Sequence, residues 1–142
     1  MLKRITYVSR FAQPLTADEL ERLGRAAAEK NESLDVTGVL MVSGGIFYQV
    51  LEGPEEPVEG IYRSIEADER HTDVLLLREE RSVDLRFFPD WSMKTINLDA
   101  AAHVRLLPLK ALIKAVFEQR RLQDNMVWAI ERTIQHEMMS GP

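Results

Sequence analysis

Two apolar, β-rich runs joined by a short glycine turn constrain the fold of this chain more than any other feature. The runs are Val36 to Val42 and Ile46 to Glu52, with Ser43-Gly44-Gly45 between them. A short link that contains glycine, placed between two such runs, is typical of a β-hairpin. We therefore expect an antiparallel pair of strands, around which the other elements are arranged.

Gln49 is a polar residue in the second of these apolar runs. Side chains alternate along a strand, so Gln49 would share its face with Phe47 and Leu51. A buried amide without a hydrogen bond costs about 1–3 kcal/mol. We therefore expect Gln49 to be hydrogen-bonded inside the core.

The order of the elements predicts the topology. A capping-box pattern at Thr16 and Glu19 begins the first helix, and Gly24 inside that helix suggests that something packs closely against it. The strands and helices other than the hairpin are predicted at Leu2 to Ser9, Thr16 to about Lys30, Glu55 to Glu69 and Val74 to Glu79. The order β-α-β-β-α-β predicts an α+β, ferredoxin-like fold with both helices on one face of the sheet.

This topology makes the first and third strands antiparallel neighbours, which can place Tyr7 beside Gln49 on the side of the sheet that faces the helices. Two polar side chains would then meet in one core. They can simply satisfy each other by hydrogen bonding, or they can serve a ligand as well. Residue patterns leave both interpretations open.

The segment after the fourth strand predicts a turn at Pro89-Asp90 and a fifth strand from Trp91 to Ile96. In such a strand Trp91, Met93 and Thr95 share one face. Ordinary core packing is the simplest role for the first two.

From Leu106 onward, apolar residues recur at helical spacing, and Asp124-Asn125 is a candidate break between two helices. This apolar surface either covers the open face of the sheet or binds a second copy of the chain. We expect a core unit over residues 1–98 and C-terminal helices over 99–142. The ending Ser140-Gly141-Pro142 favours a naturally short protein or a domain edge.

Composition excludes several classes of function. The 142 residues suit one domain, and the net charge of −5 with mixed signs argues against a nucleic-acid surface. Cysteine is absent, and His71, His103 and His136 lack metal-ligand spacing, so we expect no metal site. No secretory signal or run of about 20 apolar residues is visible, so we expect a cytoplasmic protein without a membrane partner.

Several segments, taken in order, resemble the BLUF domain, a blue-light sensor that uses flavin. The match covers roughly residues 1 to 98, and it is similar both to the BLUF portion of photoactivated adenylyl cyclases and to short BLUF proteins with a helical extension. The matching segments are Tyr7-Val8-Ser9, Asn31 with Val36-Thr37-Gly38-Val39-Leu40, Gly45 to Gly53, Asp68-Glu69-Arg70-His71, and Arg86 to Met93.

The resemblance implies that FAD, or in some members FMN, inserts its ring between the two helices. It implies that Tyr7 donates an electron and a proton to the excited flavin and that Gln49 bridges Tyr7 and the flavin. Asn31 would hold the carbonyl edge of the ring, while Trp91 and Met93 would respond to the change at Gln49. An amide suits this bridging role because it donates and accepts hydrogen bonds at once.

Lys30, Arg70 and His71 complete the predicted set of flavin-binding residues, together with Tyr7, Asn31, Gln49 and Met93. Lys30 stands where many relatives have an amide or histidine, and a lysine can still bind a phosphate or a carbonyl. Arg70 and His71 would contact the ring edge or the ribityl-phosphate arm. The alternative for these two is a solvated helix end, where cations lie near the negative pole of the helix.

The sequence therefore predicts a blue-light photoreceptor rather than an enzyme, because no nucleophile is paired with a base at useful spacing. We expect the C-terminal helices to form a homodimer or higher oligomer and to pass the light signal to a separate protein effector. One alternative is the sensor part of a longer light-activated adenylyl cyclase. Another is a ferredoxin-like interaction module without a cofactor.

Overall fold

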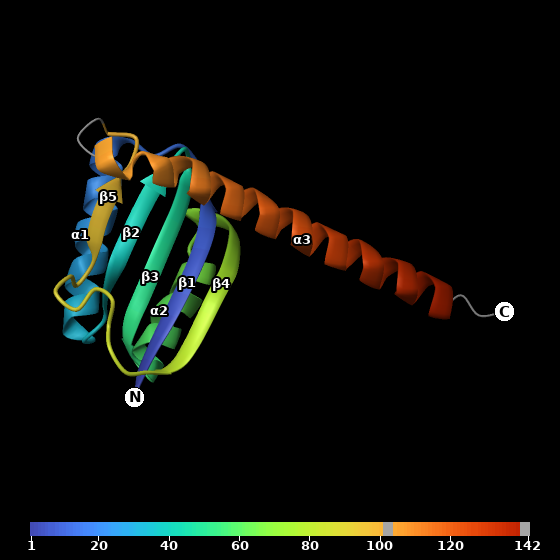
Figure 1. Cartoon of the computed structure of the whole chain (residues 1–142), viewed down its shortest axis with the longest axis horizontal. Helices are drawn as coiled ribbons and strands as arrows, with labels where there is room; N and C mark the ends of the chain where they lie inside the picture. The colour runs from blue at the N-terminus through green and yellow to red at the C-terminus, as the bar shows by residue number, and fades with distance from the viewer. Residues whose placement is uncertain (101–103, 140–142) are drawn as a thin grey trace.

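A five-stranded sheet with the strand order β4-β1-β3-β2-β5 forms the centre of the molecule (Figure 1). The structure is a computed structural model that describes residues 1–100 and 104–139; His103 and the ending 140–142 lie outside them. In chain order the elements are β1 (Leu2–Phe11), α1 (Ala17–Ser33), β2 (Thr37–Ser43), β3 (Ile46–Pro54), α2 (Glu55–Glu66), β4 (His71–Val83), β5 (Lys94–Asn97), the short 3-10 helix η1 (Val104–Leu106) and α3 (Pro108–Met139). The predicted ferredoxin-like order and the hairpin are confirmed.

The sheet separates two hydrophobic cores. Helices α1 and α2 pack on one face, where Tyr7, Phe47 and Leu51 belong to the first core. The opposite face carries Val8 and Val50, which pack with the beginning of α3 in the second core. Alternation along β1 and β3 therefore sends side chains to the two faces as predicted.

Local sequence signals explain where elements begin and turn. Thr16 and Glu19 form the predicted capping box at the start of α1. Gly44 and Gly45 turn the hairpin at φ values of 55° and 79°, a left-handed conformation that favours glycine. At Gly24, a Cβ atom would lie 2.1 Å from Oγ1 of Thr95, so the predicted close packing is confirmed.

The predicted fifth strand from Trp91 to Ile96 is wrong at its start, because β5 begins at Lys94. The carbonyl oxygens of Trp91 and Ser92 accept hydrogen bonds from the Gly38 N–H and the Asn31 side chain. These contacts hold residues 91–93 in an irregular path. Trp91 is 39% exposed while Met93 is 6% exposed, so the two do not share a face.

Helix α3 is continuous over 32 residues, and the predicted break at Asp124-Asn125 is wrong. An ion pair between Arg120 and Asp124, 3.3 Å apart, links adjacent turns just before this point. The helix begins over the sheet and then projects beyond it (Figure 1). Among the described residues, no helix combines the length and apolar character needed to cross a membrane.

Candidate functional site

A hydrogen-bonded chain of three side chains lies on the face of the sheet that α1 and α2 cover. Tyr7 and Gln49 are directly opposite each other on β1 and β3, and the Tyr7 hydroxyl donates to Oε1 of Gln49. At the other end of the amide, Nε2 donates to the sulfur of Met93 at 3.2 Å. The predicted bonded state of Gln49 is confirmed, and its amide is engaged at both ends.

A partly enclosed cavity of about 170 Å³ opens above this pair, between the two helices and the sheet. It brings together most of the predicted site residues from four parts of the chain. Its walls come from Leu23, Ala26, Ala27, Lys30 and Asn31 of α1, Ile61, Ser64 and Ile65 of α2, Tyr7, Leu40 and Gln49 of the sheet, and Asp68, Arg70 and His71 at the start of β4.

The chemistry of this lining suits a flat heteroaromatic ring with a polar edge. Apolar side chains form the walls, and the short side chains of Ala26 and Ala27 take up little of the space beside α1. The polar groups of Tyr7, Asn31 and Gln49 gather at the sheet. A flavin has this division between an apolar ring surface and an edge of hydrogen-bonding atoms, so the residues present fit it.

Asn31 is held in place by the end of α1. Its backbone oxygen accepts the N–H groups of Leu34 and Val36, which close the helix and lead into β2. Its side chain is buried and donates to the Ser92 oxygen at 3.1 Å. Asn31 and Gln49 therefore bond to two consecutive residues, Ser92 and Met93.

Tyr7 is kept protonated by its surroundings. Complete burial raises the pKa of its phenol far above the ordinary value. The ring of Tyr62 lies 5.7 Å away, and partial burial raises the pKa of Tyr62 to about 12. Burial therefore favours the protonated phenol, which donates its hydrogen bond to Gln49.

Cationic and titratable groups surround the cavity near the start of β4. Arg70 is paired with Asp68 at 2.6 Å, which lowers the pKa of that carboxyl to about 2. Nδ1 of His71 lies 2.7 Å from the Ser9 hydroxyl, and burial lowers the pKa of His71. His71 is thus half-buried at the start of a strand rather than on a solvated helix end. Lys30 is exposed on the cavity wall.

Met93 and Trp91 have different relations to the site. Met93 lies in the first core and bonds to Gln49. The ring of Trp91 stacks on Phe88 with ring centroids 5.6 Å apart and planes 9° apart. Of these two residues, Met93 is therefore the one that contacts Gln49 directly.

Sequence reasoning missed a set of buried charges at the far end of β1. Arg4 contacts Glu52 at 2.9 Å, and Lys3 contacts Glu59 at 2.5 Å and Glu79 at 2.7 Å. A signal for the first pair was present. The antiparallel register that places Tyr7 opposite Gln49 also places Arg4 opposite Glu52.

Comparison with known proteins identifies the class of this fold and site. Residues 2–94 match the family described as "BLUF: Sensors of blue-light using FAD". Because the match extends over well over half of the chain, the protein is a flavin-binding blue-light sensor. It belongs to the BLUF family, a family of sensors, as the sequence predicted.

Two curated relatives illustrate the settings of such domains. The chain is 32% identical over 101 residues to photoactivated adenylate cyclase subunit beta of Euglena longa, which covers 71% of this chain and 12% of the relative. It is 39% identical over 77 residues to the blue light- and temperature-regulated antirepressor BluF of Escherichia coli, which covers 54% of this chain and 19% of the relative. The chain thus spans a small part of either protein.

Solved structures share the fold. A bacterial light-regulated adenylyl cyclase superposes with a TM-score of 0.81 at 36% identity, covering 88% of this chain and 36% of that chain. The dark-state structure of BlrB, a BLUF protein, superposes with a TM-score of 0.67 at 29% identity, covering 83% of this chain and 96% of that one.

In residues 1–100 and 104–139, no cluster of three acidic, histidine or cysteine residues is arranged to hold a metal ion.

Proposed function

We propose that Tyr7 and Gln49 form the light-operated switch of this sensor and that Met93 reports its state. The observation that carries this proposal is the hydrogen-bonded chain from Tyr7 through Gln49 to Met93 beside the cavity. Each of the three groups has a defined direction. The phenol donates to the amide oxygen, and the amide nitrogen donates to the thioether.

Bound flavin would supply absorption of blue light and a strong tendency to take an electron when excited. Tyr7 suits the adjacent position because a phenol can release an electron and then a proton. Gln49 suits the next position because its amide can be reversed. A reversed amide would donate from Nε2 to the Tyr7 oxygen and turn Oε1 toward Met93.

The reversed amide loses its bond to Met93, because a thioether sulfur has no hydrogen to donate. Met93 therefore distinguishes the two orientations of Gln49, which Trp91, stacked on Phe88, does not do directly. A change at Gln49 is converted in this way into a change in the segment that leads into β5. This is the step at which a local hydrogen bond becomes a movement of the backbone.

We assign flavin contacts to Asn31 at the ring edge and to Lys30, Arg70 and His71 around the cavity, with Met93 acting through Gln49. FAD is the preferred cofactor because the family description names it, and FMN is the alternative with the same ring. Lys30 and the Arg70 side chain are exposed beside the cavity, where a phosphate-bearing arm would emerge. The Lys30 charge favours an anionic group there, whereas the Arg70 charge is paired with Asp68.

A continuous set of contacts supports relay from a sensor unit, residues 1–98, to the C-terminal part, residues 99–142. Leu98, directly after β5, donates its N–H to Val42 and is buried in the second core with Ile113 and Phe117. Asp99 pairs with Lys110 of α3 at 3.0 Å. Movement of β5 would therefore displace the residues that contact the beginning of α3.

We further propose that α3 forms a homodimer and acts on a separate protein effector in the cytoplasm, without catalytic output from this segment. The support for the dimer is a row of exposed apolar side chains on the projecting half of the helix. A second candidate is the sensor part of a longer adenylyl cyclase. The cyclase relatives favour it, and reading the gene beyond Pro142 distinguishes the two.

The absorption spectrum of purified protein, before and after blue light, tests the switch. We expect a flavin band that shifts reversibly to the red in the wild type. The band should remain in Tyr7→Phe and Gln49→Ala, but its red shift should be absent. Tyr48→Phe is the matched control, because Tyr48 is next to Gln49 on β3 but packs against the second core. A protein that binds no supplied flavin, or a normal shift in Gln49→Ala, contradicts the proposal.

A further inference from the structure

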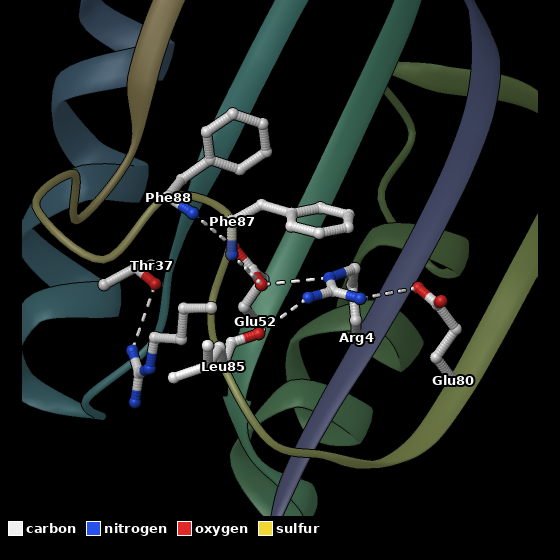
Figure 2. A network of polar contacts seen from close by, with 8 residues as sticks. Arg4, Thr37, Glu52, Glu80, Leu85, Phe87 and Phe88 are labelled. Atoms are coloured by element: carbon white, nitrogen blue, oxygen red, sulfur yellow. Dashed lines mark hydrogen bonds and ion pairs between the residues drawn. The ribbon is translucent and has the colours of Figure 1, made fainter.

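A buried carboxylate at the end of β3 binds the segment that carries Met93. Glu52 is 1% exposed, and its two oxygens accept the backbone N–H groups of Phe87 at 2.8 Å and Phe88 at 2.7 Å. Arg4 donates to the same carboxylate at 2.9 Å. Figure 2 shows these contacts converging on Glu52 from β1 and from the connecting segment, residues 84–93 between β4 and β5.

Arg4 extends this anchor toward β4. Its guanidinium also donates to Glu80 at 3.0 Å and to the Leu85 oxygen at 2.9 Å, and it lies 3.5 Å from the centre of the Phe87 ring (Figure 2). A bond that involves a charged group is roughly twice as strong as a neutral one. Breaking one member of such a buried pair leaves an uncompensated charge. The first half of the connecting segment is therefore firmly held.

The second half of the same segment is held by neutral groups. Trp91, Ser92 and Met93 each accept one hydrogen bond, from the Gly38 N–H at 2.8 Å, from Asn31 at 3.1 Å and from Gln49 at 3.2 Å. The last acceptor is a thioether, which is weak. The segment thus has a strongly held beginning and a weakly held end.

The segment also passes from one face of the sheet to the other. Phe88 packs against the second core, on the α3 side, whereas Met93 belongs to the first core, on the side of α1 and α2. Glu52 and Gln49 lie on the same strand but point to opposite faces, since they are three residues apart. Strand β3 therefore holds the connecting segment on both faces, through a charged contact and through a neutral one.

We propose that Glu52, paired with Arg4, is a positioning residue of the light switch. Glu52 keeps Leu85 to Phe88 in place in the dark and in the light, so that release of Met93 by Gln49 moves only residues 91–93 and β5 beyond them. The anchor also returns the Met93 sulfur to Gln49 when the switch resets. This proposal rests on the proposed function of Tyr7, Gln49 and Met93.

Glu52→Gln tests the anchor with little change in shape. The carboxylate offers one acceptor oxygen to each of the Phe87 and Phe88 N–H groups, whereas the amide offers a single oxygen. We expect flavin binding and the dark spectrum to be retained, since Glu52 does not line the cavity. Thermal return in the dark should slow to about one third of the wild-type rate or less, because Met93 is in place for a smaller fraction of the time.

Glu80→Gln is the matched control, because Glu80 binds Arg4 at 3.0 Å, whereas the backbone N–H groups of Phe87 and Phe88 bind Glu52. We expect a wild-type rate of return for this variant. Equal rates for Glu52→Gln and the wild type, or equal slowing in both variants, overturn the proposal.

Amide hydrogen exchange of the wild type, measured in the dark and under sustained blue light, tests the anchor without any substitution. The N–H groups of Phe87 and Phe88 should keep their protection in the light, while that of Gly38, bonded to Trp91, should lose protection at least tenfold. Loss of protection at Phe87 and Phe88 alongside a normal red shift overturns the anchor alone. Absence of a red shift overturns the proposed switch, and the anchor with it.

Discussion

At the scale of single residues, two pairs of buried polar side chains are matched across the β1–β3 strand pair. Tyr7 faces Gln49 on one side of the β1–β3 pair, and Arg4 faces Glu52 on the other. A buried polar group is costly alone and inexpensive when it is bonded. In each pair one side chain donates and the other accepts, so each pair fixes the orientation of two buried side chains.

His71 provides a pH-dependent prediction at this scale. Burial against Phe47 and beside Tyr7 lowers its pKa below the ordinary value of 6.5. The facing charges are Asp68, which favours the imidazolium, and Arg70, which disfavours it. The unfolded chain therefore binds the proton more readily than the folded one. The contribution of neutral His71 to stability is complete above pH 6.5 and is lost as the pH falls toward the folded pKa.

Nuclear magnetic resonance titration of the imidazole should give a midpoint below 6.5 in folded protein and near 6.5 in urea. The free energy of unfolding should also fall more steeply below pH 6.5 in the wild type than in His71→Gln. A midpoint above 6.5 in the folded protein would show that Asp68 outweighs burial.

At the scale of elements, the contact between α1 and β5 is tight enough to exclude one methyl group. A Cβ at Gly24 would lie 2.1 Å from Oγ1 of Thr95, whereas a Cβ at Gly60, within α2, would meet nothing within 4 Å. Gly24→Ala should lower the free energy of unfolding by about 1–3 kcal/mol, because overpacking outweighs the gain in helix propensity. Gly60→Ala should raise it by up to about 1 kcal/mol. Urea unfolding of both variants measures the difference, and stabilisation by Gly24→Ala would contradict the contact.

The sequence predicted the elements that local patterns determine and failed where contacts between distant segments decide. The hairpin, the capping box and the Tyr7–Gln49 register follow from alternation and turn residues, and all three are confirmed. The start of β5 depends on bonds from Gly38 and Asn31, which no local pattern reveals. Asp124-Asn125 has only a weak preference against helix, and the helix continues through it.

The candidate site could be predicted only in part from the sequence. Strand alternation and topology brought Tyr7 and Gln49 together, but the cofactor came from family resemblance. Only the structure distinguishes Met93 from Trp91, because both residues fit a core strand equally well in the sequence. Arg4 and Glu52 were missed because charged residues are usually exposed.

At the scale of the whole molecule, the sheet and α3 form two parts of unequal compactness. Ile113 and Phe117 bury the beginning of α3 in the second core, and the rest of the helix extends past the sheet (Figure 1). A helix of 32 residues is about 48 Å long, more than this small sheet can cover. Packing against the sheet stabilises the first half of α3. Among the described residues, the second half has no such contact with the sheet, so its exposed apolar side chains need another partner.

The projecting half carries exposed apolar side chains that recur every four residues from Leu122 to Met138, with Val127 three residues before Ile130, which is the spacing of a helix–helix interface. They are Leu122, Met126, Val127, Ile130, Ile134 and Met138, each at least 45% exposed. A second copy is the occupant we propose, because pairing two identical helices would cover the same row on each. Such a dimer would join two light sensors through the helix whose beginning packs with Leu98, the residue directly after β5.

Introducing charge into the middle of this row tests the dimer. Ile130 and Ile134 are 58% and 56% exposed, so the double variant Ile130→Asp/Ile134→Asp should fold and bind flavin normally. Two buried charges should raise the dimer dissociation constant by about tenfold or more, which analytical ultracentrifugation over a range of concentrations measures. Gln135→Asp is the control, because Gln135 lies about 140° around the helix from Ile130 and should leave the dimer unchanged. A wild type that sediments as a monomer at all concentrations contradicts the dimer, and equal weakening by Gln135→Asp would place the interface on another face of α3.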